Sequence, residues 1–260
     1  MNLSDELIKQ LEQGMYGYNP VVYDLMGKVS QSLTAVGIAL AVFFFWFDFE
    51  VQARAFEEAG TTPDMTSYSK LAMKYVMTVV VIMNSGMILN FILWIAIQIT
   101  KWVSSITVNS KSFELQSAVK AYTGHKFIMT AMMYVSDWLG NITMLFASAI
   151  AKIVLLLRFI ELYIYKAFAP IILAFFAQKD LRGNAIQFLK RFAAISLQSA
   201  VIVLVSILYN ELVTSKILEV TSKNDDWSAL GVAVSGILYG VLLVMLLLGS
   251  QKKAKEFLDR

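Results

Sequence analysis

Four long runs of the chain carry no charged residue, and they constrain the fold more than any other feature. The runs are 29–47, 75–100, 192–210 and 227–251, with 19, 26, 19 and 25 residues. An α-helix rises about 1.5 Å per residue and the hydrocarbon core of a bilayer is about 30 Å thick, so each run can cross a membrane. None shows the period-2 alternation of barrel strands. We therefore expect an all-α, polytopic transmembrane protein.

Composition supports a membrane protein over a soluble domain. Apolar residues make up 58% of the chain, charged residues 16%, and the mean hydropathy is +0.63. A soluble domain usually contains about 45–50% apolar residues, and one core of this size cannot hide so many more. The alternative, a soluble protein with buried core helices, is therefore disfavoured.

The stretch 138–177 is mostly apolar but too long for one crossing. Its 40 residues would make about 60 Å of helix, twice the hydrocarbon thickness. The charges that interrupt it are Lys152, Arg158, Glu161 and Lys166. Either it forms a hairpin of two spans with Arg158 and Glu161 near the apex, or it is one long helix that leaves the bilayer. Pro170 removes a backbone bond and is expected to kink or break the helix.

The charges of the connecting segments choose between these arrangements. Basic residues exceed acidic ones in 101–126, 178–191 and 252–260, whereas acidic residues prevail in 48–70 and 211–226. Because positive loops stay in the cytoplasm, both termini are expected inside and the two acidic loops outside. The stretch 138–177 then crosses an even number of times. The prediction is about six spans, with five as the alternative.

The expected organisation has three parts. Residues 1–28 form an N-terminal amphipathic, cytoplasmic segment, 29–251 form the transmembrane domain, and 252–260 form a basic cytoplasmic tail. The predicted spans are 29–47, 75–100, 138–157, 162–177, 192–210 and 228–250. In the first part, Leu3, Leu7, Ile8 and Leu11 have helical spacing. Gly14, Gly17 and the Asn19-Pro20 pair are expected to end the helix. This helix could lie on the membrane surface or pack on neighbouring chains.

Basic residues of the cytoplasmic segments are candidate contact residues. Segment 101–126 is expected to form a helical hairpin arm, because part of it has an apolar face. The candidates are Lys111, Lys120, Lys126, Lys179, Arg182, Lys190 and Arg191. They could bind anionic lipid, a partner ATPase or DNA phosphates, or supply only the charge that the positive-inside rule requires.

Polar residues within the spans are candidates for a conduit or for subunit contacts, because they are costly in lipid. Arg158, Glu161 and Tyr165 have the spacing i, i+3, i+7 and share one helical face. Arg158 and Glu161 could form a structural ion pair, or the face could line a conduit or lock subunits together. The other polar or path candidates are Asn84, Asn90, Pro170 and Gln198. The small residues expected to allow close helix packing are Gly231, Ser235, Gly236 and Gly240.

Residue types that carry chemistry are scarce. The chain has no cysteine and one histidine, His125, which excludes a cysteine nucleophile, a cysteine zinc site and a histidine-rich metal site. It also lacks a phosphate-binding GxxxxGK[ST] loop and the HExxH and GxSxG motifs. We expect no catalytic site, no metal and no cofactor, and hence no enzyme.

One stretch of sequence carries a family resemblance. Arg158-Phe-Ile-Glu161 is followed by Ala167-Phe-Ala-Pro170, a short basic segment, and a Phe188-Leu-Lys-Arg191 helix that reaches Leu197-Gln198. This order resembles the TrbL-like polytopic inner-membrane channel subunit of conjugative type IV secretion systems. The resemblance covers about residues 70–210, and Arg158, Glu161, Pro170, Lys190 and Gln198 match.

The resemblance implies a multi-pass protein of the inner (cytoplasmic) membrane rather than an enzyme. Its partners would be membrane lipid, further copies of itself, and other secretion subunits including an ATPase. Together they would help to move a DNA–protein substrate across the membrane. Two other functions remain open: a small-solute transporter or permease, and a non-conducting scaffold for a secretion ATPase.

Overall fold

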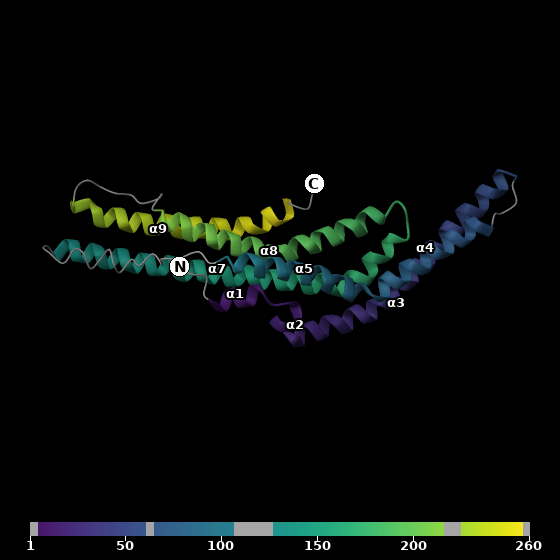
Figure 1. Cartoon of the computed structure of the whole chain (residues 1–260), viewed down its shortest axis with the longest axis horizontal. Coiled ribbons are helices and arrows are strands. Elements are labelled where there is room, and N and C mark those ends of the chain that lie inside the picture. The colour runs from purple at the N-terminus through teal and green to yellow at the C-terminus, as the bar shows by residue number, and fades with distance from the viewer. Residues whose placement is uncertain (1–4, 61–64, 107–126, 216–224, 257–260) are drawn as a thin grey trace. The chain divides into compact units, whose positions relative to one another are not determined.

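The computed structural model describes residues 5–60, 65–106, 127–215 and 225–256, and all regular structure in them is helical (Figure 1). Five helical segments in these ranges are long and apolar enough to cross a membrane. They are Pro20–Glu58, Ser85–Ser104, Ser148–Phe176, Arg182–Tyr209 and Ile237–Ala254. The all-α expectation is confirmed, and the helices have the length and composition of a multi-pass membrane protein.

The chain divides into two units, and three helices contribute residues to both. Of the described residues, the first unit contains 5–12, 97–106, 127–158, 197–215 and 225–256. The second contains 13–60, 65–96 and 159–196. The shared helices are α5 (Ser85–Ser104), α7 (Phe127–Leu173) and α8 (Arg182–Thr214).

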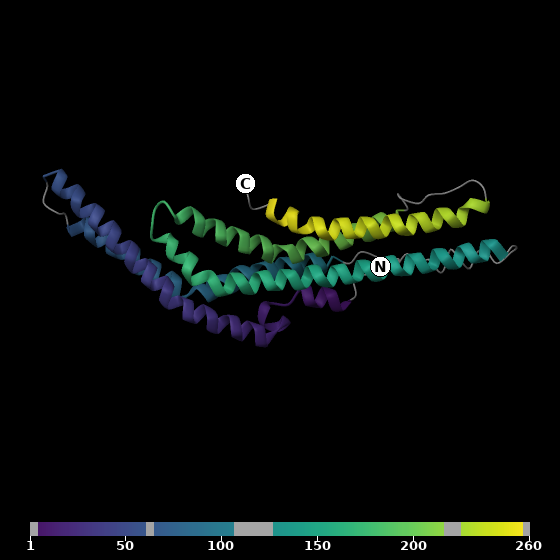
Figure 2. The same ribbon diagram turned by 180° about the vertical axis from the view of Figure 1, so that it is seen from behind.

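The second unit is built on the long helix α3 (Pro20–Glu58), which packs against α4 (Met65–Met83) running in the opposite direction (Figures 1 and 2). Aromatic rings pack between the two helices. Phe45 contacts Tyr75 and Phe49 contacts Tyr68, with ring centroids 5.2 Å apart in each case. After α3, Gly60 adopts a φ of 61°, a left-handed conformation that glycine adopts without strain.

The start of α3 differs from the prediction. The predicted N-terminal helix is α1 (Asp5–Leu11), which already ends at Leu11. A separate short helix, α2 (Met15–Tyr18), ends just before Asn19, and α3 begins at Pro20 rather than near residue 29. The Asn19 side chain accepts a hydrogen bond from the Val22 amide at 3.1 Å, and Pro20 occupies the first helical position. Both are favourable at a helix N-terminus, so the Asn-Pro pair starts the next helix as well as ending the previous one.

The predicted hairpin within 138–177 is wrong. Helix α7 runs without interruption through Arg158 and Glu161 to Leu173. No glycine or proline occurs between Gly140 and Pro170, and two charged residues one turn apart do not end a helix. Pro170 does lie near the helix end, because α7 stops three residues later and tightens into the 3₁₀ turn η1 (Ala174–Phe176).

The other predicted spans fall within observed helices, with shifted ends. The run 75–100 is divided at Asn84, which separates α4 from α5. The run 192–210 lies in α8, which already begins at Arg182, so most of the predicted basic loop 178–191 is helical. The span 228–250 lies in α9 (Asp225–Glu256), which also includes part of the predicted tail.

In the first unit, short polar contacts join helices from distant parts of the sequence. The Thr100 and Ser199 hydroxyls, of α5 and α8, lie 2.8 Å apart. The Ser104 hydroxyl donates to the Glu12 carboxylate, just after α1 (Asp5–Leu11). Leu7 and Leu11 of α1 are buried within the chain itself.

Candidate functional site

One face of α7 contacts the N-terminal helices of the second unit. Phe159, Tyr163, Lys166 and Pro170 follow one another at intervals of four, three and four residues, so they share a stripe along the helix. Each contacts α2, the Asn19 junction or α3. We call these four residues the α7 stripe.

The first two residues of the stripe hold α2. The Phe159 ring stacks on Tyr18, with centroids 3.8 Å apart and planes 7° from parallel. The buried Tyr163 hydroxyl donates to the Met15 carbonyl at 2.7 Å and lies 3.3 Å from the Asn19 carbonyl. The Met15 carbonyl also accepts the Asn19 amide, and the Asn19 carbonyl accepts the Tyr23 amide, so the Tyr163 hydroxyl is an additional donor at this junction. Tyr163 therefore ties α7 to the junction between α2 and α3.

This contact predicts the effect of Tyr163→Phe. The change removes the hydroxyl but keeps the ring, and the Met15 carbonyl keeps the Asn19 amide, so the fold should lose about 0.5–1.5 kcal/mol, the net value of one hydrogen bond. Thermal unfolding of the detergent-solubilised protein would measure the loss. Tyr16→Phe is the matched control, since Tyr16 is 62% exposed, and it should leave the unfolding midpoint unchanged. Equal midpoints for both variants would contradict a stabilising role of the Tyr163 hydroxyl.

Lys166, the third residue of the stripe, is a buried cation in a helix that can cross a membrane. Its side chain is 6% exposed. The ammonium donates to the Tyr23 carbonyl at 3.2 Å and lies 2.9 Å from the centroid of the Tyr23 ring. Asp24 adds a negative charge nearby. A π face and one carbonyl replace only part of the hydration that an ammonium has in water.

The polar contacts continue from Tyr23 to α5. The Asn90 amide donates to the Tyr23 hydroxyl at 3.1 Å. Tyr23 thus contacts Lys166 through its carbonyl and its ring, and it accepts a hydrogen bond from Asn90 at its hydroxyl. Asn90 therefore makes a hydrogen bond between helices α5 and α3.

The last residue of the stripe meets α3 at its closest point. A Cβ placed on Gly37 would lie 2.5 Å from the Pro170 carbonyl oxygen and 2.9 Å from its carbon. Real side chains cannot occupy that space, and the obstructing atoms are backbone. Gly37 is therefore the residue that lets α3 approach the end of α7.

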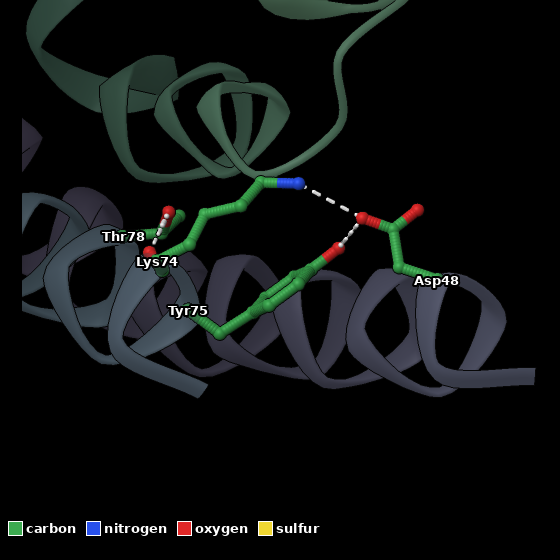
Figure 3. Close-up of polar contacts among 4 residues, drawn as sticks. All are labelled: Asp48, Lys74, Tyr75 and Thr78. Atoms are coloured by element: carbon green, nitrogen blue, oxygen red, sulfur yellow. Dashed lines mark hydrogen bonds and ion pairs between the residues drawn. The ribbon is translucent and has the colours of Figure 1, made fainter. Parts of the chain in front are cut away.

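A second polar cluster joins α3 to α4. Figure 3 shows the Asp48 carboxylate, which accepts from the Lys74 ammonium and from the Tyr75 hydroxyl, each at 2.8 Å. The Thr78 hydroxyl bonds to the Lys74 carbonyl one turn along α4. Asp48 and Lys74 had marked the ends of two uncharged runs. Their pairing explains how charged residues are accommodated there.

The predicted face of Arg158, Glu161 and Tyr165 is only partly as expected. Arg158 is fully buried, whereas Glu161 and Tyr165 are half-buried. The pairing of Arg158 with Glu161 stays a prediction. Tyr165 stacks on Phe188 with centroids 4.8 Å apart.

The remaining candidates have varied surroundings. Gln198 is buried at 2% exposure, whereas Asn84 is exposed and its amide donates to the Val80 carbonyl. Pro170 is buried. Among the small residues, Gly231, Ser235, Gly236 and Gly240 all lie in α9, and Ser235 and Gly240 are buried.

The basic candidates separate into two groups. Lys179, Arg182, Lys190 and Arg191 are exposed at and after the α7–α8 turn. Lys111, Lys120 and Lys126, with the predicted arm that carries them, lie outside the described residues, as does His125. At the end of α9, Lys253 pairs with Glu256 at 2.9 Å and lowers the pKa of that carboxyl.

Sequence reasoning missed three residues of the site: Tyr163, Lys166 and Gly37. Lys166 had been noted only as an interruption of an apolar run. The 4-3-4 spacing of the α7 stripe was a usable signal, because a lysine in register with two aromatic residues and a proline points to one packed face.

No group of three or more His, Asp or Glu side chains suited to hold a metal occurs within the described ranges. No protein-family model matches the chain, and no curated protein or solved structure is detectably similar to it.

Proposed function

We propose that this chain is a membrane-embedded subunit of a conjugative type IV secretion channel. It would assemble in several copies in the cytoplasmic membrane and help to move a DNA–protein substrate across it. The observation that carries the proposal is the buried ammonium of Lys166 on α7, inside the segment that resembles the TrbL-like family. An ionisable side chain inside a membrane-crossing helix usually marks a transport path or an assembly contact.

The distribution of buried residues supports an assembled subunit. Only 11% of the most apolar stretch of α3 is buried within the chain, against 61% for α8. The exposed residues of α3 include Phe43, Trp46 and Phe47. Such a surface needs lipid or further protein to cover it, which is what an oligomeric membrane subunit provides.

The partners provide the test of this proposal. A tagged copy would be purified from membranes of its natural host in mild detergent, and bound proteins identified by mass spectrometry. We expect the secretion ATPases and other channel subunits, in a particle containing several copies of this chain. A monomer or dimer with no secretion subunit would overturn the proposal, and a bound small solute would favour a transporter. Copurification of an ATPase alone, with one copy of this chain, would favour a scaffold.

The continuity of α7 also changes the proposed topology. An uninterrupted helix such as α7 crosses the membrane once, so we propose five crossings instead of six. The lysine-rich segment 101–126 remains in the cytoplasm and the acidic segment 48–70 outside. The N-terminus and the segment after α8 are then cytoplasmic. The basic segment 178–191 and the C-terminus lie outside, contrary to the six-span prediction.

Cysteine labelling distinguishes the two topologies, because the chain has no cysteine of its own. With five crossings, Thr61→Cys should react with an impermeant maleimide in intact cells, whereas Ser222→Cys should react only after the membrane is opened. Reaction at both positions in intact cells would restore six crossings. Reaction at Ser222 alone would reverse the orientation.

A further inference from the structure

A pocket of about 420 Å³ lies in the second unit, between the end of α7 and the start of α8. One wall is apolar and is formed by Ile164, Phe168 and Ile172, spaced four residues apart on α7. The facing wall is polar and is formed by Asn184, Gln187 and Arg191 on α8. We call this pocket the α7–α8 groove. Its volume falls in the range of small-molecule sites, about 300–1,000 Å³.

Aromatic packing holds the groove open in this form. Tyr165 and Phe188, which also line it, are stacked at 4.8 Å, and Phe192 lies 6.0 Å from Tyr165. Phe188 and Phe192 are buried, so the wall they form is anchored in the unit. The groove is therefore a built feature and not a gap between loose side chains.

Arg191 gives the groove its charge. The side chain is exposed, and it belongs to none of the ion pairs recorded among the described residues. The polar wall has the helical spacing i, i+3, i+7, with Asn184, Gln187 and Arg191 at these positions. Two side-chain amides and one guanidinium therefore lie along one face of α8. Such a face suits a phosphate, which a guanidinium binds with two parallel hydrogen bonds.

The groove lies at the start of an α8 segment that is long and apolar enough to cross a membrane, Arg182–Tyr209. Its last α8 residue, Arg191, comes directly before the uncharged run 192–210. The ten helical residues from Arg182 to Arg191 span about 15 Å, enough to pass from the headgroup layer into the hydrocarbon. A polar wall beside an apolar wall at this position fits a molecule with an anionic head and a hydrocarbon chain.

We propose that the α7–α8 groove binds one anionic phospholipid. Its phosphate is held by Arg191, the polar headgroup beyond the phosphate contacts Asn184 and Gln187, and one acyl chain packs on Ile164 and Phe168. This inference depends on the chain being a membrane protein. It does not depend on a role in secretion.

Native mass spectrometry of the purified full-length protein tests the proposal. Dioleoyl phosphatidylglycerol and dioleoyl phosphatidylcholine, which share their acyl chains, would be titrated separately. We expect phosphatidylglycerol to be retained preferentially, and Arg191→Gln to weaken its binding about tenfold. Lys190→Gln is the matched control, since it removes the same charge from the adjacent exposed residue, which does not line the groove. It should bind phosphatidylglycerol like the wild type.

A second variant tests the apolar wall. Phe168→Asn keeps every charge and should weaken retention of both lipids. Equal losses in Arg191→Gln and Lys190→Gln would mean general attraction to positive charge and would overturn the proposal. So would the absence of any preference for phosphatidylglycerol, or wild-type binding by Phe168→Asn. Because Phe168 and Arg191 are partly or largely exposed, neither variant should lower the unfolding temperature.

Discussion

Gly37→Ala is expected to destabilise the protein by about 1–3 kcal/mol, although alanine is normally the better helix residue. The added methyl carbon would lie 2.5 Å from the Pro170 carbonyl oxygen, so α3 must move away from α7 to admit it. The obstructing atom belongs to the backbone near the end of a helix and cannot rotate away. Thermal unfolding in detergent, followed by circular dichroism or by loss of solubility, would measure the change.

Gly86→Ala is the matched control for this prediction. Gly86 lies in α5, and a Cβ there would meet no atom within 4 Å. The same substitution should therefore be neutral, or stabilising by up to about 1 kcal/mol. If both variants unfolded like the wild type, the close approach of α3 to Pro170 would not be a feature of the protein in solution.

The helical class and most of the crossing helices could be predicted because their signal is local. The length of an uncharged run decides whether it can cross a bilayer, and this length does not depend on which helices lie beside it in space. Helices α3, α8 and α9 each enclose one of the predicted runs. Their ends were less accurate, since polar residues such as Asp48 extend a helix beyond its apolar run when a partner like Lys74 is available.

The site was harder to predict because burial depends on which helices meet. Charge at Arg158 and Glu161 predicts a turn, or an ion pair within one helix. The structure has no turn there, because α7 continues through both residues, and it buries Arg158 fully. Whether a lysine within an apolar run is exposed or enclosed is decided by its neighbours in space, and Tyr23, which covers Lys166, is 143 residues away.

Lys166→Met should leave the protein stable but impair its function. Methionine has a similar volume and no charge, and replacing a buried charge by an apolar residue is often neutral or stabilising. We expect the unfolding free energy to stay within about 1 kcal/mol of the wild type, or to rise. If the ammonium acts in the proposed channel, DNA transfer from a donor that lacks the wild-type gene should fall about tenfold or more. That factor corresponds to the loss of one charge-assisted contact.

Two variants separate the role of the charge at this site from general effects. Lys152→Met makes the same change on the same helix at an exposed residue, and it should transfer DNA like the wild type. Lys166→Arg keeps the charge and should retain more transfer than Lys166→Met. Normal transfer by Lys166→Met would show that the channel does not use this ammonium, although copurification with secretion subunits could still succeed. A loss of both stability and transfer would instead make Lys166 a structural link between α7 and Tyr23, because the fold would then need the contact that the methionine cannot make.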